Sequence, residues 1–108
     1  MRLWHNSLIE LLPKSQLLGQ WRELNSIFKL KNKHILINFV YDYPAYDLYC
    51  YSVNVIEAMS ARGYRVNMDN MNMYFAGYEY DYDENYIPFG FKMNDIYLKI
   101  CVINLYEK

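Results

Sequence analysis

The stretch KSQLLGQWRELNSIF, from Lys14 to Phe28, constrains the fold of this chain more than any other segment. Read at 3.6 residues per turn, its large apolar residues recur on one side, which predicts an amphipathic α-helix packed on a core. The residues on that side are Leu17, Leu18, Trp21, Leu24 and Phe28. We expect the rest of the domain to be organised around this helix.

A cation with a planar, fork-shaped guanidinium, Arg22, is followed directly by an acid, Glu23, in this helix. Gly19 precedes Glu23 by one turn, where a helical side chain would otherwise lean over the carboxylate. Because glycine inside a helix costs about 1 kcal/mol relative to alanine, its presence suggests a close approach there. The alternative is a solvated helix face on which Arg22 and Glu23 do nothing specific, as is usual for surface charges.

Two further helices are expected. One runs from Ala45 to Arg62 and is closed by Gly63 as its C-terminal cap. The other is capped by Asn94 or Asp95 and continues to about Tyr106. The residues expected to face the core are Leu48, Tyr49, Ser52, Val55, Ile56 and Met59 in the first, and Ile96, Ile100 and Ile103 in the second.

The connecting segments carry weaker signals. Ser7 is expected to cap a short helical turn that Pro13 ends, since the residue before proline leaves the helical region. The apolar run 34–40 is interpreted as buried irregular or helical structure. Residues 67–91 are rich in Asn, Asp, Tyr and Gly, which predicts a long ordered loop held by its aromatics. The fold class is therefore all-α, with residues 1–108 forming one compact domain of about three helices with long aromatic-rich loops.

Composition excludes several classes of protein. No apolar run approaches the ~20 residues of a membrane span, and the N-terminus does not resemble a secretory signal. Cys50 and Cys101 fall in apolar-periodic segments, which favours buried free thiols in a reducing compartment over a catalytic cysteine. We therefore expect a cytoplasmic monomer with no cofactor.

Charge is unevenly distributed along the chain. A basic N-terminal third could meet phosphate while the acidic segment 79–84 faces away from it. The alternative is ordinary scatter, because the formal net charge of −1 is far from the strongly basic balance typical of nucleic-acid binders. The basic residues up to position 34 are Arg2, Lys14, Arg22, Lys29, Lys31 and Lys33, against the acids Glu10 and Glu23.

Several motifs together carry a resemblance to a known family. They are MRLWH at the start, QLLGQWREL in the first helix, the histidine-led run HILINFV, and MSARGYRV at the end of the next helix. In this order they resemble the endonuclease V-type pyrimidine dimer DNA glycosylases, including bacterial relatives that begin with MRLWH. The resemblance is clear to about Gly63 and returns in IYLKICVINLYEK.

The resemblance implies an all-α domain that binds damaged duplex DNA, kinks it and extrudes a base. In this family the N-terminal α-amine attacks C1′ of the sugar to form an imine, a helix glutamate handles protons and charge, and β-elimination cuts the strand. These roles carry over here as catalytic Met1 and Glu23. The candidate DNA contacts are Arg2, Arg22, His5, Gln16, Lys29 and Lys33.

The chemistry suits these residue types. An α-amine has a reference pKa of about 7.7–8.0, so a useful fraction is neutral and nucleophilic near pH 7. A carboxylate beside it can stabilise positive charge and shuttle a proton. An arginine fork binds two phosphate oxygens at once.

The chain departs at two positions from the enzyme of this family that is known from a bacteriophage. That enzyme exposes a threonine amine after its initiator methionine is removed, whereas Arg2 stands here, so the amine would belong to Met1. Ser26 replaces a basic residue one turn after the Arg-Glu pair, which predicts weaker DNA binding.

Two other functions are compatible with parts of this sequence. The main alternative is a non-catalytic relative that keeps the fold and binds nucleic acid or a protein through its aromatic surface. A metal site on His5, His34 and Glu23 is disfavoured, because two isolated histidines lack ligand spacing.

Overall fold

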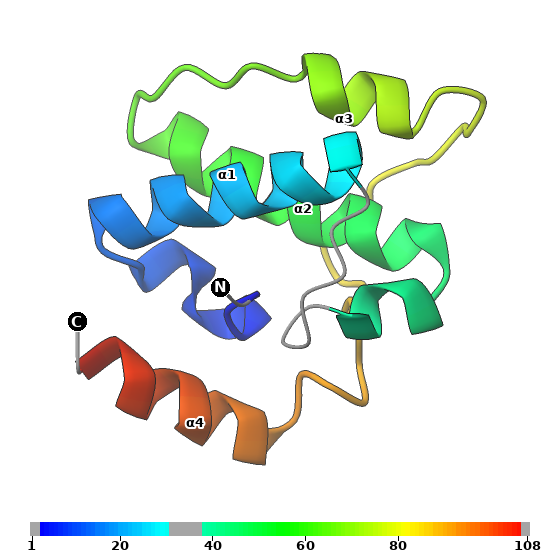
Figure 1. The fold of residues 1–108 in the computed structure, drawn as a ribbon. Coiled ribbons are helices and arrows are strands. Elements are labelled where there is room, and N and C mark those ends of the chain that lie inside the picture. The colour runs from blue at the N-terminus through cyan, green and yellow to red at the C-terminus, as the bar shows by residue number, and fades with distance from the viewer. Residues whose placement is uncertain (1–2, 31–37, 107–108) are drawn as a thin grey trace.

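A computed structural model describes residues 3–30 and 38–106, which form helices connected by loops, with no strand among them (Figure 1). The all-α prediction is therefore confirmed, and the three long helices match the three that were expected. In chain order the elements are η1 (Asn6–Leu11), α1 (Lys14–Leu30), η2 (Asn38–Asp42), α2 (Ala45–Ala61), α3 (Asp69–Tyr74) and α4 (Asp95–Tyr106), where η marks a 3₁₀ helix.

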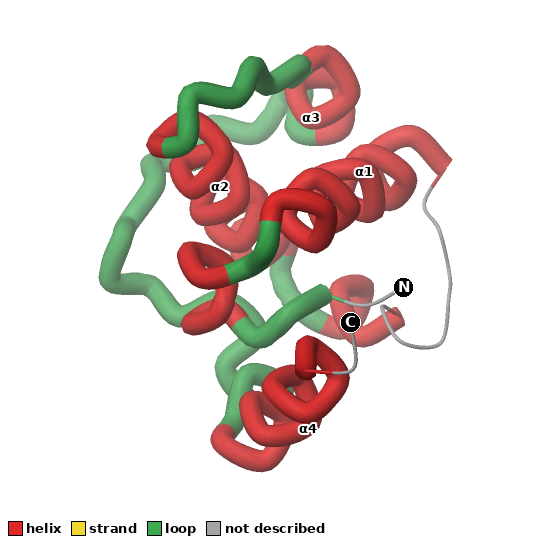
Figure 2. The backbone as a smooth tube through the Cα atoms, turned by 90° about the vertical axis from the view of Figure 1, so that its left-hand side faces the viewer, coloured by secondary structure: helices red, strands yellow, loops and turns green. Residues whose placement is uncertain are grey.

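The core lies between α1 and α2, with α3 packed on α1 and α4 on the opposite side of the molecule (Figures 1 and 2). The apolar side of α1 is buried as predicted, and Leu17 and Leu24 have no exposed surface. Burial extends beyond that stripe to Gln20, Glu23 and Ile27. A second, polar part of α1 therefore also faces the interior.

The predicted inner face of α2 is confirmed for four of its six residues, since Leu48, Ser52, Val55 and Met59 are buried. The other two, Tyr49 and Ile56, are partly buried against the core. Ser52 satisfies its hydroxyl by donating to the Leu48 carbonyl at 2.7 Å. The helix ends in a Schellman motif, in which the Tyr64 N–H donates to the Met59 carbonyl. Gly63 supports that turn with φ +79°, a conformation that side chains with a Cβ disfavour.

Two predictions of helix ends have different outcomes. Asn94 caps α4 as expected, because its Oδ1 accepts from the Tyr97 N–H at 2.9 Å. The predicted cap at Ser7 is wrong, since His5 caps η1 and its Nδ1 accepts from the Ser7 N–H at 3.2 Å. An imidazole nitrogen can act as the acceptor that an N-cap requires, although it is not among the preferred caps.

The predicted inner face of α4 is wrong. Ile96 and Ile103 are 71% and 59% exposed, and Ile100 is also exposed, whereas Tyr97 and Cys101 are buried. This helix is apolar on nearly every side, so periodicity alone could not choose the face that packs. Tyr97 points inward because its hydroxyl reaches a backbone carbonyl of the lead-in segment, Leu3–His5. The free, buried thiols of Cys50 and Cys101 are confirmed.

Residues 67–91 are not entirely loop, because α3 (Asp69–Tyr74) forms within them. This helix is too short to show periodicity, and the burial of Met71 holds it in place. The remainder is held by aromatic contacts, as predicted. Phe75 packs edge-on against Tyr49 and Phe28 with ring centroids 5.5 and 5.7 Å apart. Of the run 34–40, residues 34–37 lie outside the described part of the chain, and Val40 is buried in η2.

The C-terminal end of this loop is fixed by one buried carboxylate on α2. Asp47 accepts the Tyr86 hydroxyl at 2.7 Å and the Phe89 N–H at 2.8 Å. Phe89 has φ +56°, which is unfavourable for a residue with a Cβ by about 1–2 kcal/mol. Asp47 offsets that strain, and the fully buried Phe89 ring packs 5.8 Å from the ring of Tyr51.

This contact predicts a pH dependence of stability. The hydrogen bond to Asp47, and after it burial, raises the pKa of Tyr86 to about 12, whereas an unfolded tyrosine titrates near 10. Because the folded pKa is the higher one, the stabilisation is fully present below pH ~10 and is lost as pH rises towards ~12. Urea unfolding as a function of pH should show this decline, and Tyr86→Phe should reduce it. The matched control is Tyr106→Phe, which alters an 88% exposed side chain. A Tyr86→Phe protein with an unchanged alkaline slope would contradict this account.

Candidate active site around Glu23

Glu23 lies on the buried side of α1 and is only 9% exposed. It stands beside Gln20 and Ile27, which are buried more deeply. The alternative in which Arg22 and Glu23 lie on a solvated helix face is therefore wrong for Glu23, although the neighbouring Arg22 is exposed. A carboxylate taken out of water strongly favours nearby donors and positive charge.

A phenol from η2 lies close to this carboxylate. Burial, followed by electrostatic interaction with Tyr74 and Glu23, raises the pKa of Tyr41 above its ordinary value of 10. Tyr41 therefore keeps its proton near neutral pH.

The lead-in segment is anchored one turn before Glu23. The Trp4 N–H donates to Oε1 of Gln20 at 2.8 Å. The Tyr51 hydroxyl from α2 lies 2.6 Å from the Trp4 carbonyl and 2.9 Å from the same Gln20 oxygen. From α4, the Tyr97 hydroxyl donates to the Leu3 carbonyl. Leu3 and Trp4 are both buried, so this non-helical segment is fixed against α1.

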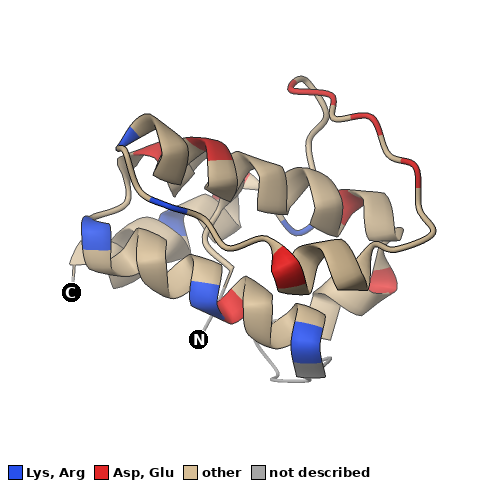
Figure 3. Ribbon diagram, turned by 90° about the horizontal axis from the view of Figure 1, so that it is seen from above, with Lys and Arg blue, Asp and Glu red and all other residues tan. Residues whose placement is uncertain are grey.

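Charged residues on the outside of α1 are well placed to meet an anion. Arg22 and Lys29 are exposed and seven residues apart, which places them on nearly the same line of the helix. Figure 3 shows Lys and Arg along α1, while the acidic segment 79–84 lies beyond α2 on the other side of the molecule. This is the separation of charge that a phosphate-binding face requires.

The space over Gly19 is partly occupied by the side chain of Arg22. A Cβ at Gly19 would lie 3.5 Å from Nη2 of Arg22, an ordinary van der Waals contact. The guanidinium therefore lies back along the helix over Gly19. This direction is typical of long helical side chains.

Of the other candidate residues, the structure describes His5 and Gln16 but not Met1, Arg2, Lys33 or His34. The ring of His5 is held by Ser7, whose Oγ lies 2.8 Å from its Nδ1, and packs 6.4 Å from Tyr97. It therefore supports the lead-in segment. Gln16 is partly exposed near the start of α1.

Three residues of this site were not identified from the sequence: Gln20, Tyr51 and Tyr97. Gln20 lies one turn before Glu23 on the same side, and a polar residue at that spacing was the available signal. Tyr51 and Tyr97 lie in other helices, and neither has a motif around it. Only the tertiary fold brings their hydroxyls to the lead-in segment.

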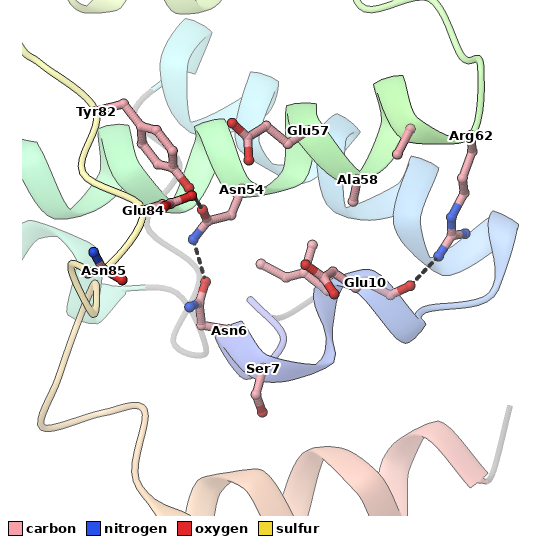
Figure 4. Close-up of a pocket in the computed structure, with 12 residues that line it drawn as sticks. Asn6, Ser7, Glu10, Asn54, Glu57, Ala58, Arg62, Tyr82, Glu84 and Asn85 are labelled. Atoms are coloured by element: carbon pink, nitrogen blue, oxygen red, sulfur yellow. Dashed lines mark hydrogen bonds between the residues drawn. The ribbon is translucent and has the colours of Figure 1, made fainter.

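A cleft of about 930 Å³ lies elsewhere, between η1, α2 and the 82–85 segment (Figure 4). Its lining includes the carboxylates of Glu10, Glu57 and Glu84, which would repel phosphate. Its floor is held by the Asn54 amide donating to Asn6 Oδ1 at 2.8 Å. Within the described residues, no group of three His, Cys, Asp or Glu side chains could hold a metal ion.

The geometry thus defines a small helical domain with a buried carboxylate beside an anchored lead-in segment and a basic helix face. The family model described as pyrimidine dimer DNA glycosylase matches residues 1–72, two thirds of the 108 residues. The chain belongs to the pyrimidine dimer DNA glycosylase family, whose substrate is DNA. Neither the comparison with curated proteins nor that with solved structures finds a match. In the part of the chain that is described, no helix is long and apolar enough to cross a membrane.

The environment of Gly19 yields a stability prediction. Gly19→Ala should raise the free energy of unfolding by about 0.5–1 kcal/mol, since alanine is the better helix former and its Cβ makes an ordinary contact. Gly63→Ala is the opposite control, because φ +79° there should make alanine destabilising. Chemical denaturation measures both variants. A loss of stability in Gly19→Ala would show that another group occupies the space over this turn.

Proposed function

We propose that this protein is a pyrimidine dimer DNA glycosylase that also cleaves the strand at the resulting abasic site. The reaction proceeds through an imine between C1′ of the sugar and the α-amine of Met1, in a chain that begins at that residue. The observation that carries the proposal is the hydrogen bond that anchors Trp4 to Gln20, one turn from the buried Glu23.

Covalent geometry makes the proposed proximity feasible. Gln20 and Glu23 are three residues apart, about 4.5 Å along the helix axis. The nitrogen of Met1 precedes the Trp4 nitrogen, which is bound to Gln20, by three residues, and these span at most about 11 Å. That length of chain is sufficient for an amine at Met1 to reach the carboxyl group of Glu23.

In the proposed reaction the neutral amine attacks C1′, and the glycosidic electron pair leaves with the base, which takes up a proton. The sugar ring opens to give a protonated imine. Loss of a proton from C2′ then breaks the 3′ C–O bond, and water releases the enzyme. Glu23 stabilises the imine's positive charge and carries protons, with added strength because its site is largely shielded from water.

The DNA strand is held by the exposed side of α1 in this proposal. Arg22 binds a phosphate with its planar fork, and Lys29 contacts another about two turns along the helix. Gln16, His5, Arg2 and Lys33 are proposed as further contacts. The acidic segment on the far side (Figure 3) keeps the duplex on this face.

Borohydride trapping on DNA with an abasic site tests the proposal. The untagged protein should form a covalent adduct, because borohydride reduces the imine to a stable amine. Glu23→Gln should lower the trapping rate by about 10²-fold or more, in the range for loss of a positioned acid or base, with little change in Kd for DNA. The matched control is Glu10→Gln, which alters an exposed acid on η1 and should behave as the wild type.

Two outcomes would count against the proposal in different ways. Salt-dependent DNA binding without any adduct, from a protein whose α-amine is shown by mass spectrometry to be free, would identify a non-catalytic relative. Normal trapping by Glu23→Gln would leave the amine in place as nucleophile and remove Glu23 from the mechanism.

A further inference from the structure

We propose that Tyr97 and Tyr51 are positioning residues for the N-terminal amine, and that α4 is thereby part of the catalytic apparatus. The family match ends at residue 72, so the contribution of α4 lies outside it. This inference rests on the proposed function, because the segment that these hydroxyls hold is the one that carries the amine.

The two hydroxyls hold consecutive carbonyls from different helices. Tyr97 of α4 donates to the Leu3 carbonyl, and Tyr51 of α2 lies 2.6 Å from the Trp4 carbonyl. Figure 2 shows the lead-in segment, Leu3–His5, lying between α1 and α4. The lead-in segment is thus held by α4 at Leu3 and by α1 and α2 at Trp4. The amine proposed as nucleophile precedes this fixed segment by two residues in the sequence.

The Tyr51 hydroxyl is a reliable donor. Burial, followed by the nearby Tyr97 and Cys101, raises the pKa of Tyr51 well above its ordinary value. Its single proton is shared between the Trp4 carbonyl and Oε1 of Gln20, at 2.6 and 2.9 Å. Buried carbonyls outside a regular helix need such partners, since leaving them without one is unfavourable.

The side chain of Tyr97 is itself held on several sides. The cap at Asn94 fixes the turn from which Tyr97 projects, through the Tyr97 N–H. The Nζ of Lys92 lies 4.7 Å from the centre of the phenol ring, and the His5 ring lies 6.4 Å away. A hydroxyl on a ring packed in this way can direct a neighbouring segment, because it has little freedom to follow it.

The variant Tyr97→Phe removes only the hydroxyl and keeps the ring. We expect the single-turnover rate of borohydride trapping on saturating abasic-site DNA to fall about tenfold or more, since small misplacements of a reacting group have effects of this size. The Kd for DNA and the final adduct yield should stay unchanged. The matched control, Tyr106→Phe on the same helix, alters an 88% exposed tyrosine and should react as the wild type.

These readouts separate positioning from simple structural support. A variant that is only less stable would lose adduct yield in proportion to its unfolded fraction, while its folded molecules would react at the normal rate. That result, or an unchanged rate in Tyr97→Phe, would overturn the proposal. Tyr51→Phe gives a second test from the opposite helix, should one of the two variants fail to fold.

Amide hydrogen exchange provides a second test that does not depend on enzymatic activity. The Trp4 N–H, bound to Gln20, should exchange faster in Tyr97→Phe and Tyr51→Phe than in the wild type and in Tyr106→Phe. Unchanged exchange in both variants would overturn the idea that these hydroxyls fix the lead-in segment. A wild-type protein that forms no adduct, with faster Trp4 exchange in the variants, would instead refute the lyase proposal and support the fixing of that segment.

Discussion

The rest of the site depends on a buried hydrogen bond between the side-chain amide of Gln20 and the backbone of Trp4. A non-helical segment can enter a core only if its N–H and carbonyl groups find partners. Gln20 accepts the Trp4 N–H at 2.8 Å and is itself only 2% exposed. Leaving such an N–H buried without a partner would cost about 1–3 kcal/mol. This one side chain therefore decides whether the lead-in segment lies against α1 or leaves the core.

The same helix combines a buried polar side with an exposed basic one. Gln20 and Glu23 face inward, while Arg22 lies back over Gly19 towards solvent. A single rigid element thus holds a carboxylate shielded from water and, at the adjacent residue, a cation able to bind phosphate. This arrangement suits chemistry on a charged polymer, because the strand and the reacting sugar need different environments a few ångströms apart.

Much of the fold could be predicted from local patterns, because α1 and α2 are long and strongly periodic and Gly63 ends α2 by a conformation that few residues adopt. The packed face of α4 could not be predicted, since apolar residues surround the helix and the choice depends on a partner for the Tyr97 hydroxyl. Helix α3 was not predicted, because a helix of six residues is too short to show a periodic pattern of apolar residues. Its position comes from the burial of Met71.

The site was predictable to the same extent and for related reasons. Glu23 and Arg22 belong to a sequence motif, and the family match to residues 1–72 contains both of them. Tyr51 and Tyr97, which are 46 residues apart in sequence, each contact the lead-in segment through a single hydroxyl. Such contacts cannot be predicted from composition or residue spacing, because a tyrosine with this contact and any other buried tyrosine occupy the same kind of position in the sequence.

The most direct test of this account is to locate the trapped DNA on the polypeptide. After borohydride reduction, digestion and mass spectrometry, the sugar remnant should be found on the N-terminal peptide, attached to the α-nitrogen of Met1. A remnant attached to a lysine side chain, such as that of Lys29, would contradict the claim that the anchored start of the chain supplies the nucleophile beside Glu23.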